Sequence, residues 1–93
     1  MSRYVLLYES AEDVASKAPA HLPAHRARWQ AYRDAGTLLQ IGTFADVQAH
    51  GSMAIFTSGE AAREFAEGDP FVLEGVVARW EIREWDEALK RDE

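Results

Sequence analysis

Hydrophobic positions along the chain fall into six segments, and their spacing changes from the period of a strand to that of a helix and back. Residues 3–9 alternate between two faces that are both apolar, as in a strand covered on both sides. Apolar residues three and four positions apart predict helices over residues 21–36 and 59–67. Further strands are expected at residues 37–44, 52–57 and 76–85.

Local signals mark where the two helices begin and end. Gly36 suits a left-handed cap at the end of the first helix. Thr57, with Glu60 three residues later, resembles a capping box that opens the second helix. Gly68 is expected to end that helix.

Two connections are long enough to matter for function. Residues 46–51 are expected to form the turn of a hairpin between the second and third strands. Residues 10–20 are polar and small, and we expect a loop with one short helical turn. A loop of this length is often functional, and it precedes the first helix, so it could roof one end of a pocket.

The order of elements is β-α-β-β-α-β, and it predicts the fold class. Two right-handed crossovers of this kind interleave into a four-stranded antiparallel sheet with both helices on one face. We therefore predict an α+β, ferredoxin-like domain that spans residues 1–93.

The face of the sheet that carries no helix would be too apolar for water. Both sides of the first strand are apolar, with Tyr4, Leu6 and Tyr8 on one and Val5 and Leu7 on the other, and Trp85 adds to the uncovered side at the end of the last strand. In the last strand, strict alternation places Val77 opposite to Trp80. We predict a homodimer that packs sheet against sheet into a barrel-like body.

Composition narrows the class of protein. The 93 residues are 47% hydrophobic, which is enough for a single modest core. Without cysteine there is no disulfide framework and no thiolate chemistry. No apolar stretch approaches the ~18–20 residues of a membrane span, and we expect a cytoplasmic protein with no membrane partner. A net charge of -6 without a Lys/Arg cluster argues against nucleic-acid binding.

The first helix carries a histidine on its apolar side. Leu22, His25, Trp29 and Tyr32 are three, four and three residues apart, which places all four on one side of the helix. A buried imidazole without a hydrogen-bond partner costs about 1–3 kcal/mol. His25 therefore needs a polar group opposite it, while the other polar residues of the helix should face water: Arg26, Arg28, Gln30, Arg33 and Asp34.

Asp69 is the leading candidate for that partner. Pro70 keeps Asp69 out of the helical region directly after a helix ends, and the two helices pack side by side in this topology. A carboxylate on one imidazole nitrogen would leave the other nitrogen free as a general base. The residues alone leave a second interpretation open, in which Asp69 caps local backbone N–H groups and His25 is a satisfied core histidine.

Other candidate sites are weaker. His21 and His25 have the spacing of a metal-binding pair, but zinc needs three or four good ligands and His50 lies in a distant loop. We therefore expect no metal and no cofactor. The tyrosines and tryptophans are expected mainly in the core and interface, and the serines lack the context of a nucleophile.

A set of short motifs in a fixed order carries a resemblance. It includes the strand 4–8, His25 with the residues that follow it, Gly42, and Glu60-Ala61-Ala62. Its most specific part is Asp69-Pro70-Phe71, followed by Gly75 and a strand that ends at Trp85. Over nearly the whole chain these motifs resemble the YciI-like (YCII-related) family.

That resemblance implies a ferredoxin-like dimer of the dimeric α/β-barrel type and a His-Asp active site, which falls on His25 and Asp69. We expect the substrate to be bound by residues nearby: Tyr8, Gly42, Pro70 and Phe71. The family includes a branch that resembles dehalogenating or lyase-type enzymes acting on small cyclic or aromatic compounds. Two positions depart from the family pattern: Gly42 is followed by threonine rather than proline, and Leu22 stands where an arginine is frequent.

Two functional hypotheses follow. The first is a cofactor-independent enzyme, of the lyase, isomerase or dehalogenase type, in which His25 moves a proton on a small organic substrate and Asp69 supports it. The second is a non-catalytic module that binds a small ligand or serves for dimerisation.

Overall fold

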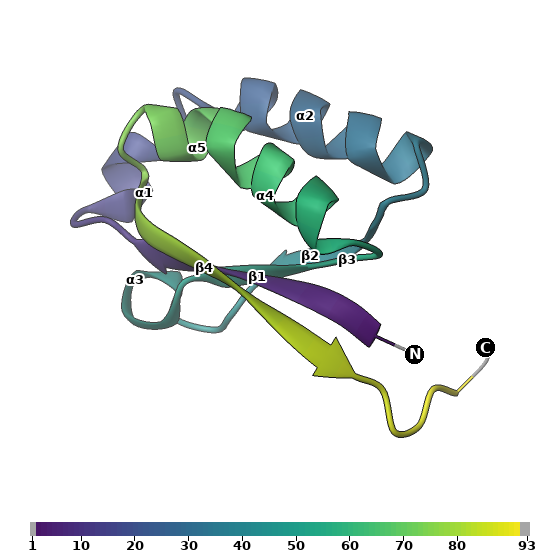
Figure 1. Ribbon diagram of the computed structural model, residues 1–93. Helices are drawn as coiled ribbons and strands as arrows, with labels where there is room; N and C mark the ends of the chain where they lie inside the picture. Colours follow the sequence, from purple (N-terminus) through teal and green to yellow (C-terminus); the bar gives the residue numbers. More distant parts are fainter. Residues whose placement is uncertain (1, 92–93) are drawn as a thin grey trace.

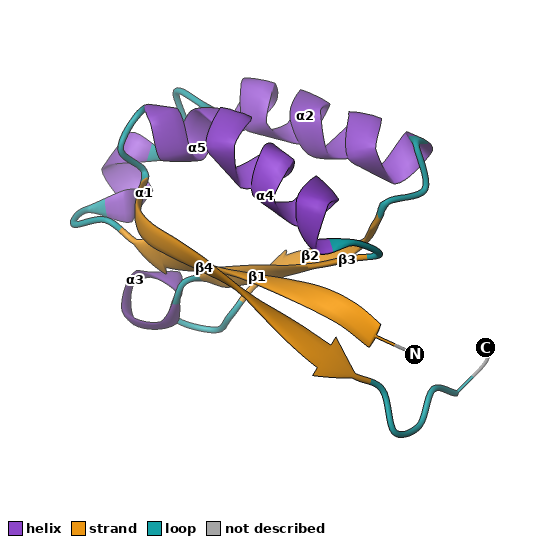
Figure 2. Ribbon diagram, in the orientation of Figure 1, coloured by secondary structure: helices purple, strands orange, loops and turns teal. Residues whose placement is uncertain are grey.

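A computed structural model describes residues 2–91 of the chain, and Figures 1 and 2 show its elements. In chain order these are β1 (Ser2–Ser10), α1 (Val14–Lys17), α2 (Leu22–Asp34), β2 (Leu38–Thr43), α3 (Val47–His50), β3 (Ser52–Phe56), α4 (Gly59–Gly68), α5 (Pro70–Leu73) and β4 (Val77–Asp86).

The four strands form one antiparallel sheet in the order β2-β3-β1-β4. The helices α2, α4 and α5 lie over one face of this sheet, and α3 projects beyond the other face at one corner (Figure 1). The predicted α+β, ferredoxin-like fold is therefore confirmed. The two termini of the described chain, on β1 and after β4, lie at the same end of the sheet (Figure 2).

The core lies between the sheet and α4. Leu6 and Phe56 face the helices from the two central strands, and Phe65 of α4 packs on them. The rings of Phe56 and Phe65 are 5.4 Å apart between centroids. Burying a large apolar side chain of this kind contributes about 1.5–3 kcal/mol, so these residues account for much of the stability of this layer.

The last strand departs from strict alternation. Ser10 pairs with Val77, but Glu9 pairs with Arg79, so Ala78 is an extra residue in β4. A bulge of this kind shifts the side-chain phase by one residue. Val77 consequently belongs to the core on the helical side together with Trp80, and the prediction that these two residues lie on opposite faces is wrong.

Short helices replace two segments that the sequence predicts as irregular. The turn at residues 46–51 contains α3, which ends at Gly51. Gly51 has a φ of +73°, and a Cβ there would lie 1.9 Å from the carbonyl oxygen of Tyr8. Glycine is therefore required both by the backbone conformation and by the close approach of β1. Residues 70–73, to which no helix or strand is assigned from sequence, form α5.

The residue that caps α4 is Ser58 and not Thr57. The Ser58 hydroxyl accepts a hydrogen bond from the N–H of Ala61 at 3.1 Å, and Ser58 has the extended backbone expected of an N-cap. The strand β3 ends at Phe56, and the N–H of Thr57 donates to the carbonyl of Thr37 instead. The cap therefore lies one residue later than predicted, and the predicted capping box is not formed because Ala61 stands at the third position of the helix.

The predicted helical turn within residues 10–20 is present as α1, but the segment does not roof a pocket. Gln48 of α3 fastens it elsewhere: its side chain accepts from the N–H of Val14 at 2.9 Å and donates to the carbonyl of Ala11 at 2.8 Å. Val14 is buried in this contact between α1 and α3. The segment thus closes one corner of the sheet.

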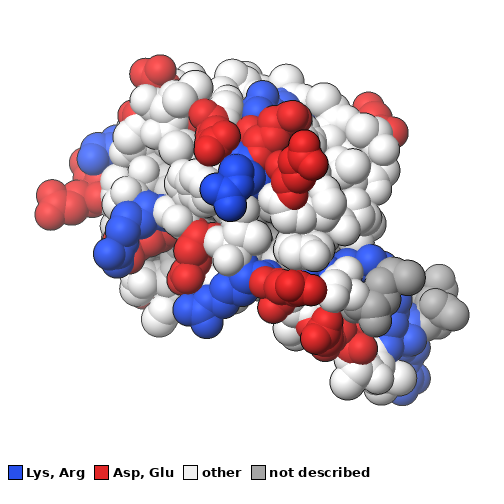
Figure 3. Space-filling view, in the orientation of Figure 1, with Lys and Arg blue, Asp and Glu red and all other residues white. Residues whose placement is uncertain are grey.

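Charged side chains are interspersed on the face seen in Figure 3, where acidic and basic residues alternate over α4 and β4.

One arginine on α2 differs from the prediction that it faces water. Arg28 is half-buried and donates to the carbonyls of Phe65 and Glu64 at 3.1 and 2.8 Å, which ties α2 to the end of α4.

Candidate active site

The structure brings His25 and Asp69 into direct contact. His25 is the buried residue of α2, and Asp69 lies between α4 and α5. Nδ1 of the imidazole is 2.8 Å from Oδ1 of the carboxylate and 3.1 Å from Oδ2. Asp69 has no exposed surface, whereas His25 remains 9% exposed. The two side chains therefore lie in contact, and one of them, His25, can still be reached by solvent.

Three donors surround the buried carboxylate. The Tyr8 hydroxyl donates to Oδ2 at 2.6 Å, the N–H of Phe71 donates to Oδ1 at 3.1 Å, and the imidazole of His25 is the third partner. Asp69 has an extended backbone (φ -71°, ψ 125°), as Pro70 requires of its predecessor. The carboxylate caps α5 and contacts His25 at once, so the two interpretations of Asp69 from sequence describe one arrangement.

The orientation of the imidazole follows from these contacts. An ionised carboxylate only accepts hydrogen bonds, so Nδ1 of His25 carries the proton and Nε2 is left with a lone pair in the neutral ring. The ring stacks on Phe71 with centroids 3.9 Å apart and planes 7° from parallel, and it packs on Phe65 in a T-shaped arrangement with centroids 6.3 Å apart. Packing on two sides and a hydrogen bond on a third leave the imidazole little freedom to rotate.

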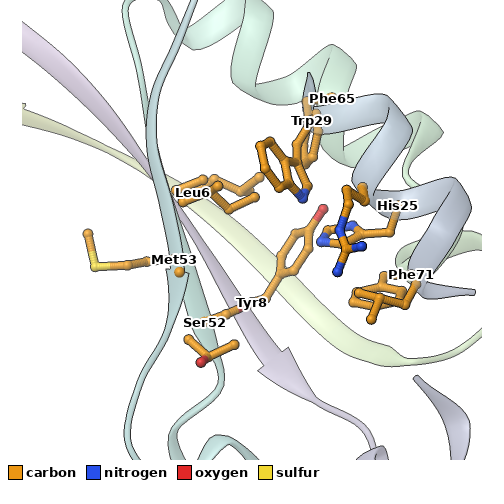
Figure 4. Close-up of a pocket in the computed structure, with 14 residues that line it drawn as sticks. Leu6, Tyr8, His25, Trp29, Ser52, Met53, Phe65 and Phe71 are labelled. Carbon is orange, nitrogen blue, oxygen red and sulfur yellow. The ribbon is translucent and has the colours of Figure 1, made fainter. Parts of the chain in front are cut away.

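Tyr8 belongs to this network through its hydroxyl. Burial, followed by the negative charge and the hydrogen bond of Asp69, raises the pKa of the Tyr8 phenol well above its ordinary value. The phenol therefore remains a donor across the neutral range. In Figure 4 its hydroxyl points from β1 toward His25.

A cavity of about 310 Å³ adjoins the imidazole, between α2 and the β1–β3–β2 side of the sheet. Aliphatic and aromatic side chains form most of its wall, and Figure 4 shows the residues that line it: Leu6, Tyr8, Leu22, His25, Arg26, Trp29, Ile41, Gly42, Thr43, Ser52, Met53, Ala54, Phe65 and Phe71. Pockets that bind small organic molecules have this apolar lining with a few polar groups.

Most of the residues expected at the site are at this cavity. His25, Tyr8, Gly42 and Phe71 line it. Asp69 lies behind the imidazole, and Pro70 is not among the lining residues in the described part of the chain. The segment expected to roof the pocket, residues 10–20, contributes nothing to its wall.

Sequence reasoning missed the roles of three positions on α2. Leu22 is 38% exposed at the cavity rather than in the core, and Trp29 is both a core residue and part of the wall. Arg26 is exposed, as the sequence predicts, and it also lines the cavity. A signal was available, because Arg26 lies one turn after Leu22 and therefore on the same side of the helix.

Among residues 2–91, no three His, Cys, Asp or Glu side chains are grouped so that they could hold a metal ion.

None of the helices formed by residues 2–91 is long and apolar enough to cross a membrane.

Comparison with known proteins gives the family. A family model described as YCII-related domain matches residues 2–86. Protein YciI of Escherichia coli is 36% identical over 90 residues, which cover 86% of this chain and 92% of that protein, and Protein YciI of Shigella flexneri matches to the same extent.

A solved structure also shares the fold. It is 5-chloro-2-hydroxyhydroquinone dehydrochlorinase (TftG) from Burkholderia phenoliruptrix in complex with 2,5-dihydroxybenzoquinone, with a TM-score of 0.72 and 18% sequence identity. The alignment covers 90% of this chain and 93% of that one, so the likeness extends over the whole fold. On its sequence match over residues 2–86, the chain belongs to the YciI-like (YCII-related) family.

Proposed function

We propose that the chain is a small acid–base enzyme of the lyase, isomerase or dehalogenase type that needs no cofactor. The observation that carries this proposal is the contact between the buried carboxylate of Asp69 and Nδ1 of His25. Because Nδ1 is occupied, Nε2 is the basic nitrogen, and His25 lines an apolar cavity. A positioned base of this kind contributes typically about 10²–10⁴-fold to a rate.

The chemistry is a proton transfer at carbon. Nε2 of His25 removes a proton next to a carbonyl or on an activated ring, and the electron pair of that C–H bond forms a new double bond. Loss of a neighbouring leaving group with its bonding electrons completes an elimination. Return of the proton to a different carbon completes an isomerisation.

The surrounding residues support each step. Asp69 stabilises the imidazolium formed when the proton is taken, because the carboxylate is 2.8 Å from Nδ1. Tyr8 and the N–H of Phe71 hold that carboxylate in place. We propose that Gly42 and the exposed parts of Tyr8 and Phe71 contact the substrate, and that Pro70 acts indirectly by fixing Asp69.

The fold comparison is consistent with this chemistry. A protein named as a dehydrochlorinase, in complex with 2,5-dihydroxybenzoquinone, has the same fold. Dehydrochlorination is an elimination, although at 18% identity the likeness extends to the fold and not to the substrate.

Deuterium exchange into simple carbon acids tests this proposal. A panel of small cyclic ketones and hydroxyquinones is incubated with the protein in D₂O, and incorporation at carbon is followed by NMR. We expect exchange that is lost in His25→Gln and retained in His21→Gln, which changes the half-exposed histidine one turn earlier. Exchange that is equal in the two variants would show that His25 is not the base.

A non-catalytic ligand-binding or dimerisation module is the second candidate. It is favoured by the hydrogen bonds of Asp69, because both carboxylate oxygens already have partners within the chain, as in a purely structural role. This alternative predicts ligand-induced stabilisation without product. It also predicts that the affinity for the ligand does not depend on whether His25 carries a second proton.

We propose further that two copies pair through the face of the sheet opposite to α2 and α4. Val5 and Leu7 of β1 are only half-buried on that face within one copy, and Trp85 of β4 is 48% exposed. Sedimentation at micromolar concentration should show a dimer. Leu7→Lys, which places a charge in the middle of this face, should convert it to a monomer, and a monomeric unmodified protein would refute the pairing.

A further inference from the structure

We infer that the cavity beside His25 is selective for a negatively charged, single-ring ligand, and that Arg26 binds its anionic group. This inference rests on the proposed function, because it takes the cavity to be the substrate site. It adds the class of ligand: a carboxylate, phenolate or enolate on a small flat body.

The charge of the cavity wall is the first argument. Arg26 is the one Lys or Arg among the lining residues of the described chain, and none of those residues is Asp or Glu. The whole chain has 16 acidic and 10 basic residues, so a wall without carboxylates differs from the rest of the molecule. Asp69 is fully buried behind the imidazole, and its oxygens are occupied by three donors.

The second argument is that Arg26 has no partner within the described residues. Arg28, two residues later, donates to backbone carbonyls of α4, and Arg33, Arg79 and Arg83 are each within 3.3 Å of a carboxylate oxygen. The guanidinium of Arg26 makes no hydrogen bond or ion pair with any other residue in 2–91. Its five donors are therefore available to a ligand, and their planar arrangement suits bidentate contact with a carboxylate.

The third argument is the shape of the remaining wall. Trp29 and Phe71 present aromatic surfaces to the cavity, and Leu22 and Ile41 present aliphatic ones. The volume of about 310 Å³ is near the lower limit of pockets that hold organic ligands, which favours a molecule of one ring. An apolar body and one anionic group together match the wall.

Such a ligand also fits the proton transfer. When Nε2 of His25 removes a proton from a carbon conjugated to the anionic group, negative charge accumulates on the ligand. The positive charge of Arg26, in the same cavity, stabilises the negative charge added in the transition state as well as the anionic group of the bound ligand. Arg26 would therefore determine both which ligand binds and how the charge that develops is stabilised.

A matched pair of probes tests the inference, and it needs no turnover. Benzoate and benzamide have nearly the same shape but differ in charge, and calorimetry gives their affinities. We expect benzoate to bind at least about tenfold more tightly, as a charged hydrogen-bonded pair implies. We also expect this preference to disappear in Arg26→Gln and to remain in Arg63→Gln, an exposed arginine on α4 away from the cavity.

Equal affinity for the two probes, no measurable binding of benzoate, or an unchanged preference in Arg26→Gln would each overturn the inference. The His25→Gln variant separates it from the proposed function. If anion preference persists in that variant and no exchange activity exists in the unmodified protein, the ligand class stands and the acid–base function fails.

Discussion

The two long helices lie on the same face of the sheet but differ in how they contact it. The helix α4 buries three apolar residues, Ala62, Phe65 and Ala66, each with no exposed surface. The helix α2 buries only His25, and its Leu22 and Trp29 remain partly open. The helix α2 has 13 residues and α4 has 10, so the difference lies not in length but in which side chains face the sheet.

This difference shows how the domain separates stability from chemistry. The apolar residues of α4 are completely buried against the sheet, whereas the incomplete contact of α2 leaves the cavity that adjoins the imidazole. The first turn of α4 is also held more firmly than that of α2. Ser58 caps α4 with its side chain, whereas His21 at the start of α2 makes no such bond. We therefore expect α4 to control folding and α2 to control ligand binding.

The largest effect is expected from truncating the core residue of α4. Phe65→Ala should lower the free energy of unfolding by about 3–5 kcal/mol, because it creates a cavity among Phe56, Ala62 and their neighbours. Leu22→Ala on α2 is the matched control, and it should lower the free energy of unfolding by less than about 1 kcal/mol because Leu22 is already partly exposed. Urea unfolding measures both, and equal losses would remove the distinction between the helices.

A smaller loss is expected where the site contacts the core. Tyr8→Phe removes the hydroxyl that donates to the buried carboxylate of Asp69 at 2.6 Å. Losing a hydrogen bond to a charged group should cost about 1.5–3 kcal/mol of unfolding free energy. If the variant is as stable as the unmodified protein, the contact between Tyr8 and Asp69 contributes nothing to the fold.

The same phenol predicts a dependence on alkaline pH. Its pKa is raised in the folded state, mainly by burial, so the folded protein retains a proton that the unfolded chain loses above pH ~10. Stability is therefore fully present below that pH and should fall above it by up to about 1.4 kcal/mol per pH unit.

Tyr8→Phe should reduce this alkaline slope. Tyr32→Phe is the control, since burial also raises the pKa of Tyr32 but its ring is less enclosed. We expect a smaller change of slope there. A slope that is the same in both variants would place the titrating group elsewhere.

The smallest effect concerns the start of α4. Ser58→Ala removes the side-chain bond to the N–H of Ala61 and should destabilise the protein by about 1 kcal/mol. Thr57→Ala, at the residue that the sequence favours as the cap, should have less effect. Thermal unfolding of the two variants distinguishes these positions, and a larger loss for Thr57→Ala would restore Thr57 as the cap.

The period of the apolar residues was sufficient to predict the order of the elements and the side of α2 on which His25 lies. Proline chemistry was sufficient to predict the extended backbone of Asp69, because Pro70 acts on its immediate neighbour. Together with the topology, these local rules placed the imidazole and the carboxylate in one part of the fold. Each depends on residues close in sequence, and for that reason each can be derived without coordinates.

Tertiary contacts decided the rest. The bulge that turns Val77 inward depends on how β4 pairs with β1, and the donation from Tyr8 to Asp69 joins residues 61 positions apart. The direction of Arg26 depends on the space that α2 leaves above the sheet. No local pattern encodes these features, because strand register, packing and cavities arise from the simultaneous fit of segments that are distant in the chain.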